Sequence, residues 1–175
     1  MKTTKIQKTI RCRKGERVSL EPFSFVRCNE FYHLYLASKA KWEKFLILHF
    51  KTIDNAHEFI AQQYNNDRFT GYFVINNSTN KMVGFILGDE INSDSIMRTR
   101  ATGEEYENLG YGYEATQLFE ALMKEAGYLS IRLSCEEDNL RSKELLLRDG
   151  YQYNRSVRVS VPGVSLKFDF FSKQL

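Results

Sequence analysis

The sequence predicts one α+β domain of three layers, in which helices cover both faces of a mixed, mostly antiparallel, twisted sheet. Three observations predict it. Residues 72–87 read as two apolar strands joined by a turn rich in Asn, and residues 157–171 form a second alternating hairpin. Between these hairpins, apolar residues at helical spacing precede another strand pattern. The resulting order of elements predicts about six to seven strands and about four helices.

The first half of the chain supplies a strand, two helices and the first hairpin. Residues 17–23 alternate as a strand does, and residues 25–38 carry apolar side chains at helical spacing. A second helix begins near Asp54, with Asp54 or Thr52 as its N-cap. The hairpin over 72–87 follows this helix.

The second half of the chain starts with a strand over residues 95–102, one face of which is unusually polar because it carries Arg98 and Arg100. A glycine-rich turn then opens a long helix that Gly127 ends. The remaining expected elements are a strand over 128–133, a helix over 139–149 and a hairpin that turns at Pro162-Gly163.

Length and charge suit one domain of ordinary composition. The chain has 175 residues, 42% of them hydrophobic, and a net charge of +3, so neither a nucleic-acid groove nor a polybasic membrane surface is required. Lysine and arginine concentrate before residue 15, and a nucleic-acid-binding arm is the alternative to a solvated terminus there. We expect residues 1–15 to be a basic extension or strand ahead of a domain over 16–175, with no nucleic acid and no membrane as partners.

Cysteine usage indicates a reducing compartment. Cys12, Cys28 and Cys135 are odd in number and scattered, which supports neither a disulfide framework nor a zinc site. The sequence has no apolar run near 18 residues and no signal-peptide pattern at its start. We therefore expect a cytoplasmic protein that holds no metal.

The most informative motif lies before the long helix, where Gly110 and Gly112 flank Tyr111. Glycines at a helix entrance let the backbone approach a ligand's phosphates, which then face free N–H groups and the positive end of the helix dipole. A second motif, Asn139-Leu140-Arg141-Ser142, begins 27 residues after Gly112. Together they predict a site for an anionic ligand.

In this order and spacing, the motifs resemble those of the GNAT superfamily of acyl-CoA-dependent N-acetyltransferases, particularly its branch similar to ribosomal-protein N-terminal acetyltransferases. The family's pyrophosphate signature falls on residues 107–112, and Asn139-x-x-Ser142 with Gly150-Tyr151 resembles its next motif. The resemblance covers roughly residues 16–171. It implies a GNAT-like domain over 16–175, with the sheet splayed between its fourth and fifth strands.

The resemblance further implies that acetyl-CoA, as co-substrate, lies in this splayed gap. Backbone N–H groups of the strand over 95–102 would hold the acyl oxygen. The implied cofactor-binding residues are Ala101, Thr102, Glu107, Asn108, Leu109, Gly110, Tyr111, Gly112, Tyr113 and Asn139. For Asn139, a plain helix cap is the competing interpretation.

Acetyl transfer needs a deprotonated amine, a polarised carbonyl and a neutralised thiolate. Many relatives use a Tyr where this chain has Leu146, so Ser142 is our candidate donor to the sulfur; a helix Ser bonded to local backbone is the competing reading. Glu105 is our candidate general base. Glu104, Asp89 and Glu90 are alternatives, and for each of these acids a solvated loop carboxylate is the competing role.

The chain departs from the family pattern at two places. Glu107 stands where the family has Gln or Arg, and a carboxylate repels a pyrophosphate unless it points to solvent. The strand over 95–102 carries Arg98 and Arg100 where mostly apolar or aromatic residues are expected. The second departure concerns the substrate side of the site.

The function that these features favour is transfer of an acetyl group from acetyl-CoA to a primary amine, by direct attack in a ternary complex, in a monomer or homodimer. A non-catalytic acyl-CoA-binding or sensing module is the first alternative. The second is an NAD(P)- or flavin-binding oxidoreductase, since Gly110-x-Gly112-x-x-Ala115 with Glu136 fits a dinucleotide fingerprint. That fingerprint normally follows the first parallel strand, whereas this one lies late in the chain.

Overall fold

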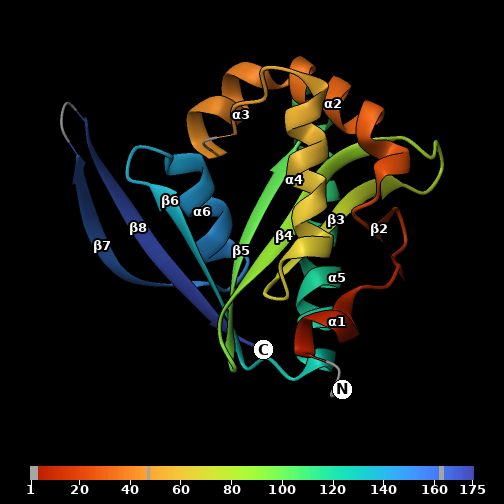
Figure 1. The fold of residues 1–175 in the computed structure, drawn as a ribbon. Coiled ribbons are helices and arrows are strands. Elements are labelled where there is room, and N and C mark those ends of the chain that lie inside the picture. Colours follow the sequence, from red (N-terminus) through yellow and green to blue (C-terminus); the bar gives the residue numbers. More distant parts are fainter. Residues whose placement is uncertain (1–3, 47, 162–163) are drawn as a thin grey trace.

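One mixed sheet runs through residues 4–46, 48–161 and 164–175, which the computed structural model describes. In these residues eight strands follow one another in the order β1-β2-β3-β4-β5-β6-β8-β7 (Figure 1). The strands are β1 (Arg13–Lys14), β2 (Val18–Pro22), β3 (Phe69–Asn76), β4 (Met82–Asn92), β5 (Ser95–Thr102), β6 (Ser130–Glu136), β7 (Gln152–Val161) and β8 (Val164–Gln174).

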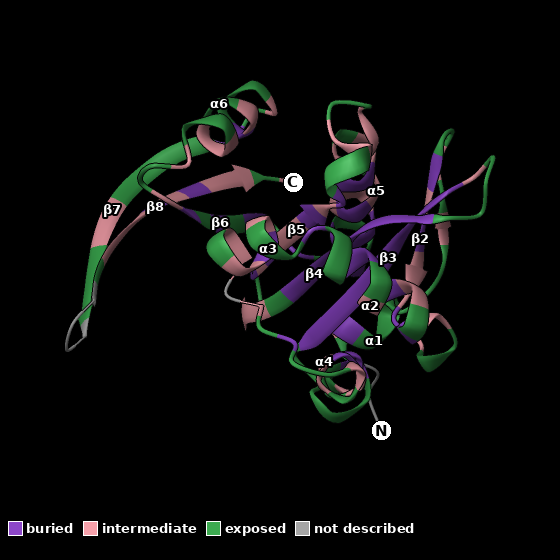
Figure 2. Ribbon diagram, turned by 90° about the horizontal axis from the view of Figure 1, so that it is seen from above, coloured by how far each residue is buried: buried purple, intermediate pink, exposed green. Residues whose placement is uncertain are grey.

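Helices cover both faces of this sheet and create the three predicted layers. The helices of the described residues are α1 (Lys5–Thr9), α2 (Cys28–Ala37), α3 (Lys39–Leu46), α4 (Ile53–Asn65), α5 (Tyr111–Ala126) and α6 (Leu140–Arg148), with 3-10 turns η1 (Phe25–Arg27) and η2 (Glu104–Tyr106). One apolar core lies under α1, α5 and α6, and another lies under α2, α3 and α4. Figure 2 shows buried β3 and β4 between these layers, and largely exposed β7 at the far edge.

Among the described residues, the sheet divides at its one parallel pair of strands. β5 and β6 pair only through Ser95 with Ser130, Ile96 with Ile131 and Met97 with Arg132. β5 continues to Thr102 and β6 to Glu136 without further pairing between them among the described residues. The expected splay between the fourth and fifth main strands is therefore confirmed, and it leaves backbone hydrogen-bonding groups free on both sides.

Most expected elements are confirmed because their signals are local. β5 matches the predicted strand over 95–102, Thr52 caps α4, and α5 ends at Gly127, whose φ is +93°. The turn expected at Pro162-Gly163 lies outside the described residues. The helices α1 and α3 were not predicted, and the two-residue β1 lies within the segment expected to be an extension or strand.

The missed helix α3 lacks a sequence signal because it carries three lysines and buries only Trp42. Its place is fixed by tertiary contacts, since Trp42 Nε1 donates to the carbonyl of Thr102 at 3.2 Å. α3 thereby reaches the free edge of β5.

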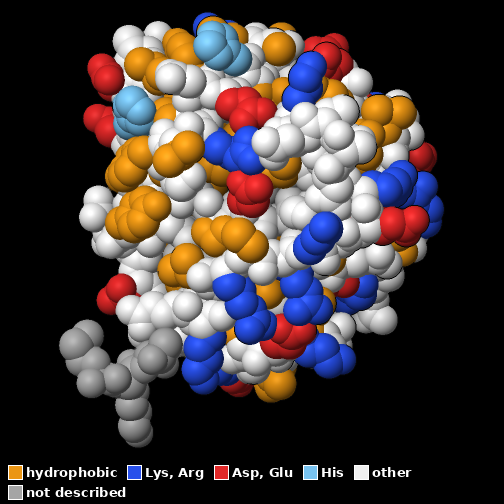
Figure 3. Space-filling view, turned by 90° about the vertical axis from the view of Figure 1, so that its right-hand side faces the viewer, with side chains coloured by type: hydrophobic (Ala, Val, Ile, Leu, Met, Phe, Trp, Pro, Cys, Tyr) orange, Lys and Arg blue, Asp and Glu red, His pale blue; other side chains and the backbone are white. Residues whose placement is uncertain are grey.

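The basic N-terminal segment folds onto the domain. Ile6 of α1 is buried, Lys5 donates to the carbonyl of Gly127 at 2.7 Å, and Arg11 and Arg13 both pair with Glu125 of α5. This segment was expected to be an extension or strand, and it forms α1 followed by β1. Figure 3 shows basic and acidic side chains interspersed on this side of the molecule.

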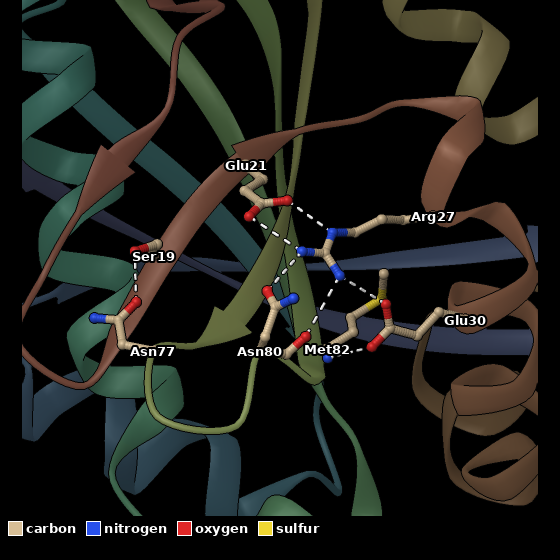
Figure 4. A network of polar contacts seen from close by, with 7 residues as sticks. All are labelled: Ser19, Glu21, Arg27, Glu30, Asn77, Asn80 and Met82. Atoms are coloured by element: carbon tan, nitrogen blue, oxygen red, sulfur yellow. Dashed lines mark hydrogen bonds and ion pairs between the residues drawn. The ribbon is translucent and has the colours of Figure 1, made fainter.

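A polar network fixes α2 against the sheet edge (Figure 4). The Arg27 guanidinium donates to Glu21 of β2 at 2.7 Å, to Glu30 of α2 at 2.9 Å and to the Asn80 side chain at 3.0 Å. Glu30 in turn accepts from the Met82 N–H at 2.6 Å. The hydrogen bond with Glu21 raises the pKa of Arg27, so this cation stays charged and holds three segments together.

Candidate active site

A cleft of about 600 Å³ opens where β5 and β6 separate. β5 and β6 form its sides, and α3, α5, α6 and the loop over 107–110 border it. Every cofactor-binding residue predicted from the sequence except Leu109 lines this cleft. The splay thus gathers the signature and the Asn-Ser motif, which are far apart in the sequence, around one cavity.

The loop before α5 has the geometry of a phosphate cradle. Asn108 and Gly110 adopt positive φ angles of 61° and 81°, and Gly110 is the N-cap of α5. A Cβ atom on Gly112 would meet Thr102 Oγ1 at 2.9 Å. The first amides of a helix have no carbonyl partners within it, so this cradle presents donors to an anion.

Cations surround the cradle. Arg17 NH1 donates to the Leu109 carbonyl at 2.9 Å, and Arg141 NH2 donates to the Asn108 side chain at 2.5 Å. Lys41 also lies on the cleft wall. The donor set of backbone amides and flexible cations suits a diphosphate, so the residues present fit acetyl-CoA.

Glu107, the departure inside the signature, is paired. Its Oε1 atom accepts from Lys41 of α3, and its Oε2 atom lies 3.3 Å from Arg141 NH1. These two ion pairs offset the carboxylate's charge beside the cradle. Glu107 also links α3 to α6 across the mouth of the cleft.

The polar face of β5 points toward α5 and borders the cleft. Arg98 NH1 donates to Thr116 Oγ1 of α5 at 2.7 Å, and Arg100 NH1 donates to the Gly112 carbonyl at 2.6 Å. Ala101, on the opposite face of the strand, packs in the core under α2 and α4. The arginines and Ala101 therefore lie on opposite faces of β5.

The two signature tyrosines differ in their surroundings. Tyr111 Oη accepts from Asn76 Nδ2 at 2.9 Å, and the Arg17 guanidinium lies 5.7 Å from its ring centre. Tyr113 is exposed and its hydroxyl accepts from Gln117. Tyr111 is thus held by the fold, while Tyr113 is free to cover a ligand.

The Asn-Ser motif opens α6 at the cleft. Asn139 is the N-cap, since its side chain accepts from the Ser142 N–H at 3.2 Å. Both residues line the cleft, and Leu146 is buried one turn beyond Ser142. The Ser142 hydroxyl is therefore available to a ligand, because the cap uses only its backbone.

Glu105 is not brought to the site. It is exposed in η2 and does not line the cleft, and neither do its alternatives Glu104, Asp89 and Glu90. The described carboxylates on the wall are Glu107, Glu136 and Asp149. Glu136, at the end of β6, entered the sequence analysis only as a ribose ligand in the dinucleotide alternative.

Two cations of the site were missed by sequence reasoning. Arg141 stands inside the quoted Asn-Ser motif, so attention to that position would have found it. Lys41 lies on α3, a helix without a sequence signal, and no pattern indicates that it reaches Glu107.

The splayed sheet, the glycine cradle and the surrounding cations together define an acyl-CoA-binding domain. A family model described as an acetyltransferase (GNAT) domain matches residues 17–152. The chain belongs to the GNAT acetyltransferase family, whose members use acetyl-CoA. No curated protein sequence matches the chain closely enough to add a relative.

Solved structures share the fold at low sequence identity. A GNAT-family acetyltransferase from Bacillus anthracis is 19% identical, with a TM-score of 0.80 over 94% of this chain and 98% of that chain. The Salmonella typhimurium acetyltransferase that modifies the N-terminal serine of ribosomal protein L7/L12 is 14% identical, with a TM-score of 0.80 over 92% and 96%. The microcin C7 self-immunity acetyltransferase MccE, in complex with acetyl-CoA and AMP, is 18% identical, with a TM-score of 0.80 over 92% and 94%.

These structures confirm the predicted fold, and the similarity to a ribosomal-protein acetyltransferase agrees with the predicted branch. The late position of the glycine motif, followed here by α5, β6, α6 and a hairpin, is that of this fold and not of a dinucleotide-binding sheet. In the described part of the chain, no helix is both long and apolar enough to span a membrane.

Proposed function

We propose that this chain transfers an acetyl group from acetyl-CoA to the primary amine of a peptide N-terminus or a small molecule, by direct attack in a ternary complex. The single observation that carries the proposal is the cleft itself. It joins a phosphate cradle to an apolar wall on which Ala101 and Phe45 lie. A donor that enters from the cradle and an acceptor that enters beside this wall would meet at β5.

The cradle and its neighbours are proposed to bind the donor. The amides of residues 111–113 and the side chains of Lys41 and Arg141 would hold the diphosphate. Thr102 and Asn139 line the path from there into the splay. Because β5 has no partner strand beyond Met97, its free edge can bind the extended arm of the donor as another strand would.

The acyl transfer makes three demands on the protein. A backbone N–H on the free edge of β5, that of Arg100 or Thr102, is proposed to hold the acyl oxygen, and Ser142 to donate a hydrogen bond to the sulfur. Glu136, on the cleft wall, replaces Glu105 as the candidate general base, because Glu105 does not line the cleft. An amine that enters uncharged, or that loses its proton to water, needs no strong base.

A peptide N-terminus is the first acceptor to test, since the Salmonella neighbour modifies an N-terminal serine. We also propose a cytoplasmic location, which the free Cys12, Cys28 and Cys135 support.

The decisive experiment measures CoA release over a panel of amines and N-terminal peptides, together with thermal shifts for acetyl-CoA, CoA, NAD and NADP. Stabilisation of roughly 2 to 4 kcal/mol by the CoA ligands alone, with turnover of at least one amine, is expected. Stabilisation without turnover of any acceptor would favour the sensing module. Stabilisation by NAD or NADP in place of CoA would reject the acetyltransferase.

A further inference from the structure

Two arginines of β5 lie side by side at the base of the cleft with no acid bound to them. Arg98 is 6% exposed, and Arg100 is half-buried on the same face of the strand. Both line the cleft. Buried cations are normally paired with carboxylates, because removing a charge from water is costly. These two residues therefore raise the question of which anion they serve.

Their protein partners are all neutral oxygens. The two NH1 atoms share Thr116 Oγ1, at 2.7 Å from Arg98 and 2.6 Å from Arg100, and Arg100 NH1 also donates to the Gly112 carbonyl. Arg98 Nε is buried and has no hydrogen-bond partner. Within the described residues, neither guanidinium forms an ion pair with a carboxylate. Positive charge at this point is thus concentrated and incompletely neutralised.

The surrounding groups do not cancel this charge. Burial, followed by repulsion from Arg98, lowers the pKa of Arg100 to about 10, against the weaker opposing effects of Asp149, Tyr151 and Glu120. Tyr151 hydrogen-bonds Glu120, and Lys173 pairs with the same carboxylate. Arg100 remains protonated at neutral pH and strongly favours a nearby anion.

The position of the pair along the cleft restricts that anion. The cradle over 107–112 marks the phosphate end, and the last β5–β6 pair, Met97 with Arg132, marks the closed end. A donor bound at the cradle can reach inward only between these limits, past Thr102 and toward Arg100. An acyl oxygen on a free-edge N–H of β5, that of Arg100 or Thr102, would place the neighbouring sulfur close to the Arg100 side chain.

We propose that Arg98 and Arg100 form an anion subsite for the sulfur of CoA, with Arg100 as the catalytic residue that stabilises the leaving thiolate and Arg98 as its positioning residue. This inference rests on the proposed acetyl transfer. It also explains how the site functions with Leu146 where many relatives have Tyr. Ser142, on the facing wall, adds one hydroxyl donor to the same sulfur.

The step balances without any further reactant. The amine lone pair forms the C–N bond with the acyl carbon, and the ammonium proton passes to water. The C–S bond then breaks with its electron pair on sulfur, and the thiolate formed is held by the Arg100 guanidinium. Because that cation is already in place and desolvated, its stabilisation is greater for the thiolate than for the neutral thioester.

The test measures the ionisation of bound CoA. Thiolate ultraviolet absorbance is followed against pH for the protein saturated with CoA, with desulfo-CoA as the blank. A free thiol has a pKa of about 8.5, and binding beside Arg100 is expected to lower it by roughly one unit or more. Arg100→Gln should abolish that shift and lower kcat roughly tenfold to a hundredfold, with KM for acetyl-CoA within about threefold of wild type.

Arg100→Lys, which keeps the charge, should restore much of the shift, and Arg98→Gln should reduce it. Arg132→Gln, on the exposed side of neighbouring β6, is the matched control and should change neither reading. A merely structural role for Arg100 would lower the melting temperature without moving the thiol pKa.

The outcomes separate the two proposals. Failure of the wild-type protein to bind CoA would reject the proposed function. If the wild-type protein binds CoA and turns over but the thiol pKa is unshifted, only the arginine subsite is overturned. This measurement uses the wild-type protein and does not depend on whether a variant folds. A shift that persists in Arg100→Gln would also overturn the arginine subsite.

Discussion

Lys41 of α3 and Glu107 of the cradle form an ion pair across the mouth of the cleft, although they are 66 residues apart in the sequence. Arg141 of α6 pairs with the same carboxylate at 3.3 Å. The Glu107 carboxylate thus forms ion pairs with two cations that would also bind a diphosphate. The pair makes donor binding a competition between Glu107 and the ligand.

Glu107→Gln should therefore strengthen acetyl-CoA binding, because the substitution frees Lys41 and Arg141 and removes a repulsive charge. A gain of roughly threefold to tenfold at low ionic strength is expected, and it should shrink in high salt. Calorimetric titration at two salt concentrations measures it. Glu125→Gln, which breaks the ion pairs with Arg11 and Arg13 away from the cleft, is the control and should leave affinity unchanged.

Gly110→Ala should weaken both the fold and donor binding. Its φ of 81° costs an L residue roughly 1 to 2 kcal/mol, and the new Cβ would meet Arg17 NH2 at 2.8 Å beside the cradle. Gly127→Ala carries the same backbone penalty at a φ of 93°, far from the cleft. Both variants should lose melting temperature, Gly110→Ala the more because of its contact with Arg17, and only Gly110→Ala should lose acetyl-CoA affinity. Equal affinities in the two variants would contradict the cradle.

Ser142→Ala should lower kcat by up to roughly tenfold without changing stability. The hydroxyl would donate to the sulfur, whereas the helix cap uses the Ser142 N–H and the Asn139 side chain. Asn139→Ala removes that cap and should cost about 1 kcal/mol of stability. Steady-state kinetics and melting curves of both variants separate the two effects. Unchanged turnover in Ser142→Ala would remove its proposed role.

Cys135 should resist alkylation at pH 8 and be protected further by acetyl-CoA. Burial raises the pKa of its thiol to about 11, and the residue lines the cleft. Since the thiolate is the reactive form, reaction at pH 8 should be roughly a hundredfold slower than at exposed Cys12. Peptide mapping after iodoacetamide treatment gives both rates. Protection of Cys12 by acetyl-CoA would indicate a global effect instead.

Asp169→Asn should destabilise the protein at neutral pH and lose its effect in acid. Lys143 of α6 pairs with Asp169 of β8 and, with Ser156, holds the pKa of that carboxyl below its usual value. A lowered folded-state pKa gives stability that is present above the unfolded pKa, about 3.9, and is lost as pH falls through the folded value. Denaturation midpoints of wild type and variant should therefore differ at pH 7 and converge below about pH 4. Glu137→Gln, which breaks an exposed pair with Lys167, serves as the control.

Local signals explain which elements the sequence could predict. Each correctly placed element depends on a signal in its own residues. Gly110 and Gly112 mark the start of α5, Gly127 marks its end, and alternation marks the strand over 95–102. α3 could not be predicted, because its position depends on Trp42 reaching the Thr102 carbonyl. A helix held by one buried aromatic side chain has no periodic pattern to read.

The same distinction holds for the site. The cradle was predicted because a phosphate loop is contiguous in sequence, whereas the pairing of Glu107 with Lys41 requires the folded chain. The arginines of β5 were identified as a departure from the family pattern that concerned the substrate side. A strand pattern alone does not say which layer of helices each face of the strand contacts. Contact of both with Thr116 assigns that face to the α5 side.

Only three residue pairs join β5 to β6, so the sheet consists of two parts, β1–β5 and β6–β8, that are connected over a short length. Backbone hydrogen bonds hold the strands together within each part. Beyond Met97, β5 and β6 share no further backbone pairing in the described residues. A donor that lies along β5 and contacts Asn139, which follows β6, would therefore take the place of a strand between the two parts. Under the proposed function, binding of the donor would therefore complete the sheet and join its two parts in each catalytic cycle.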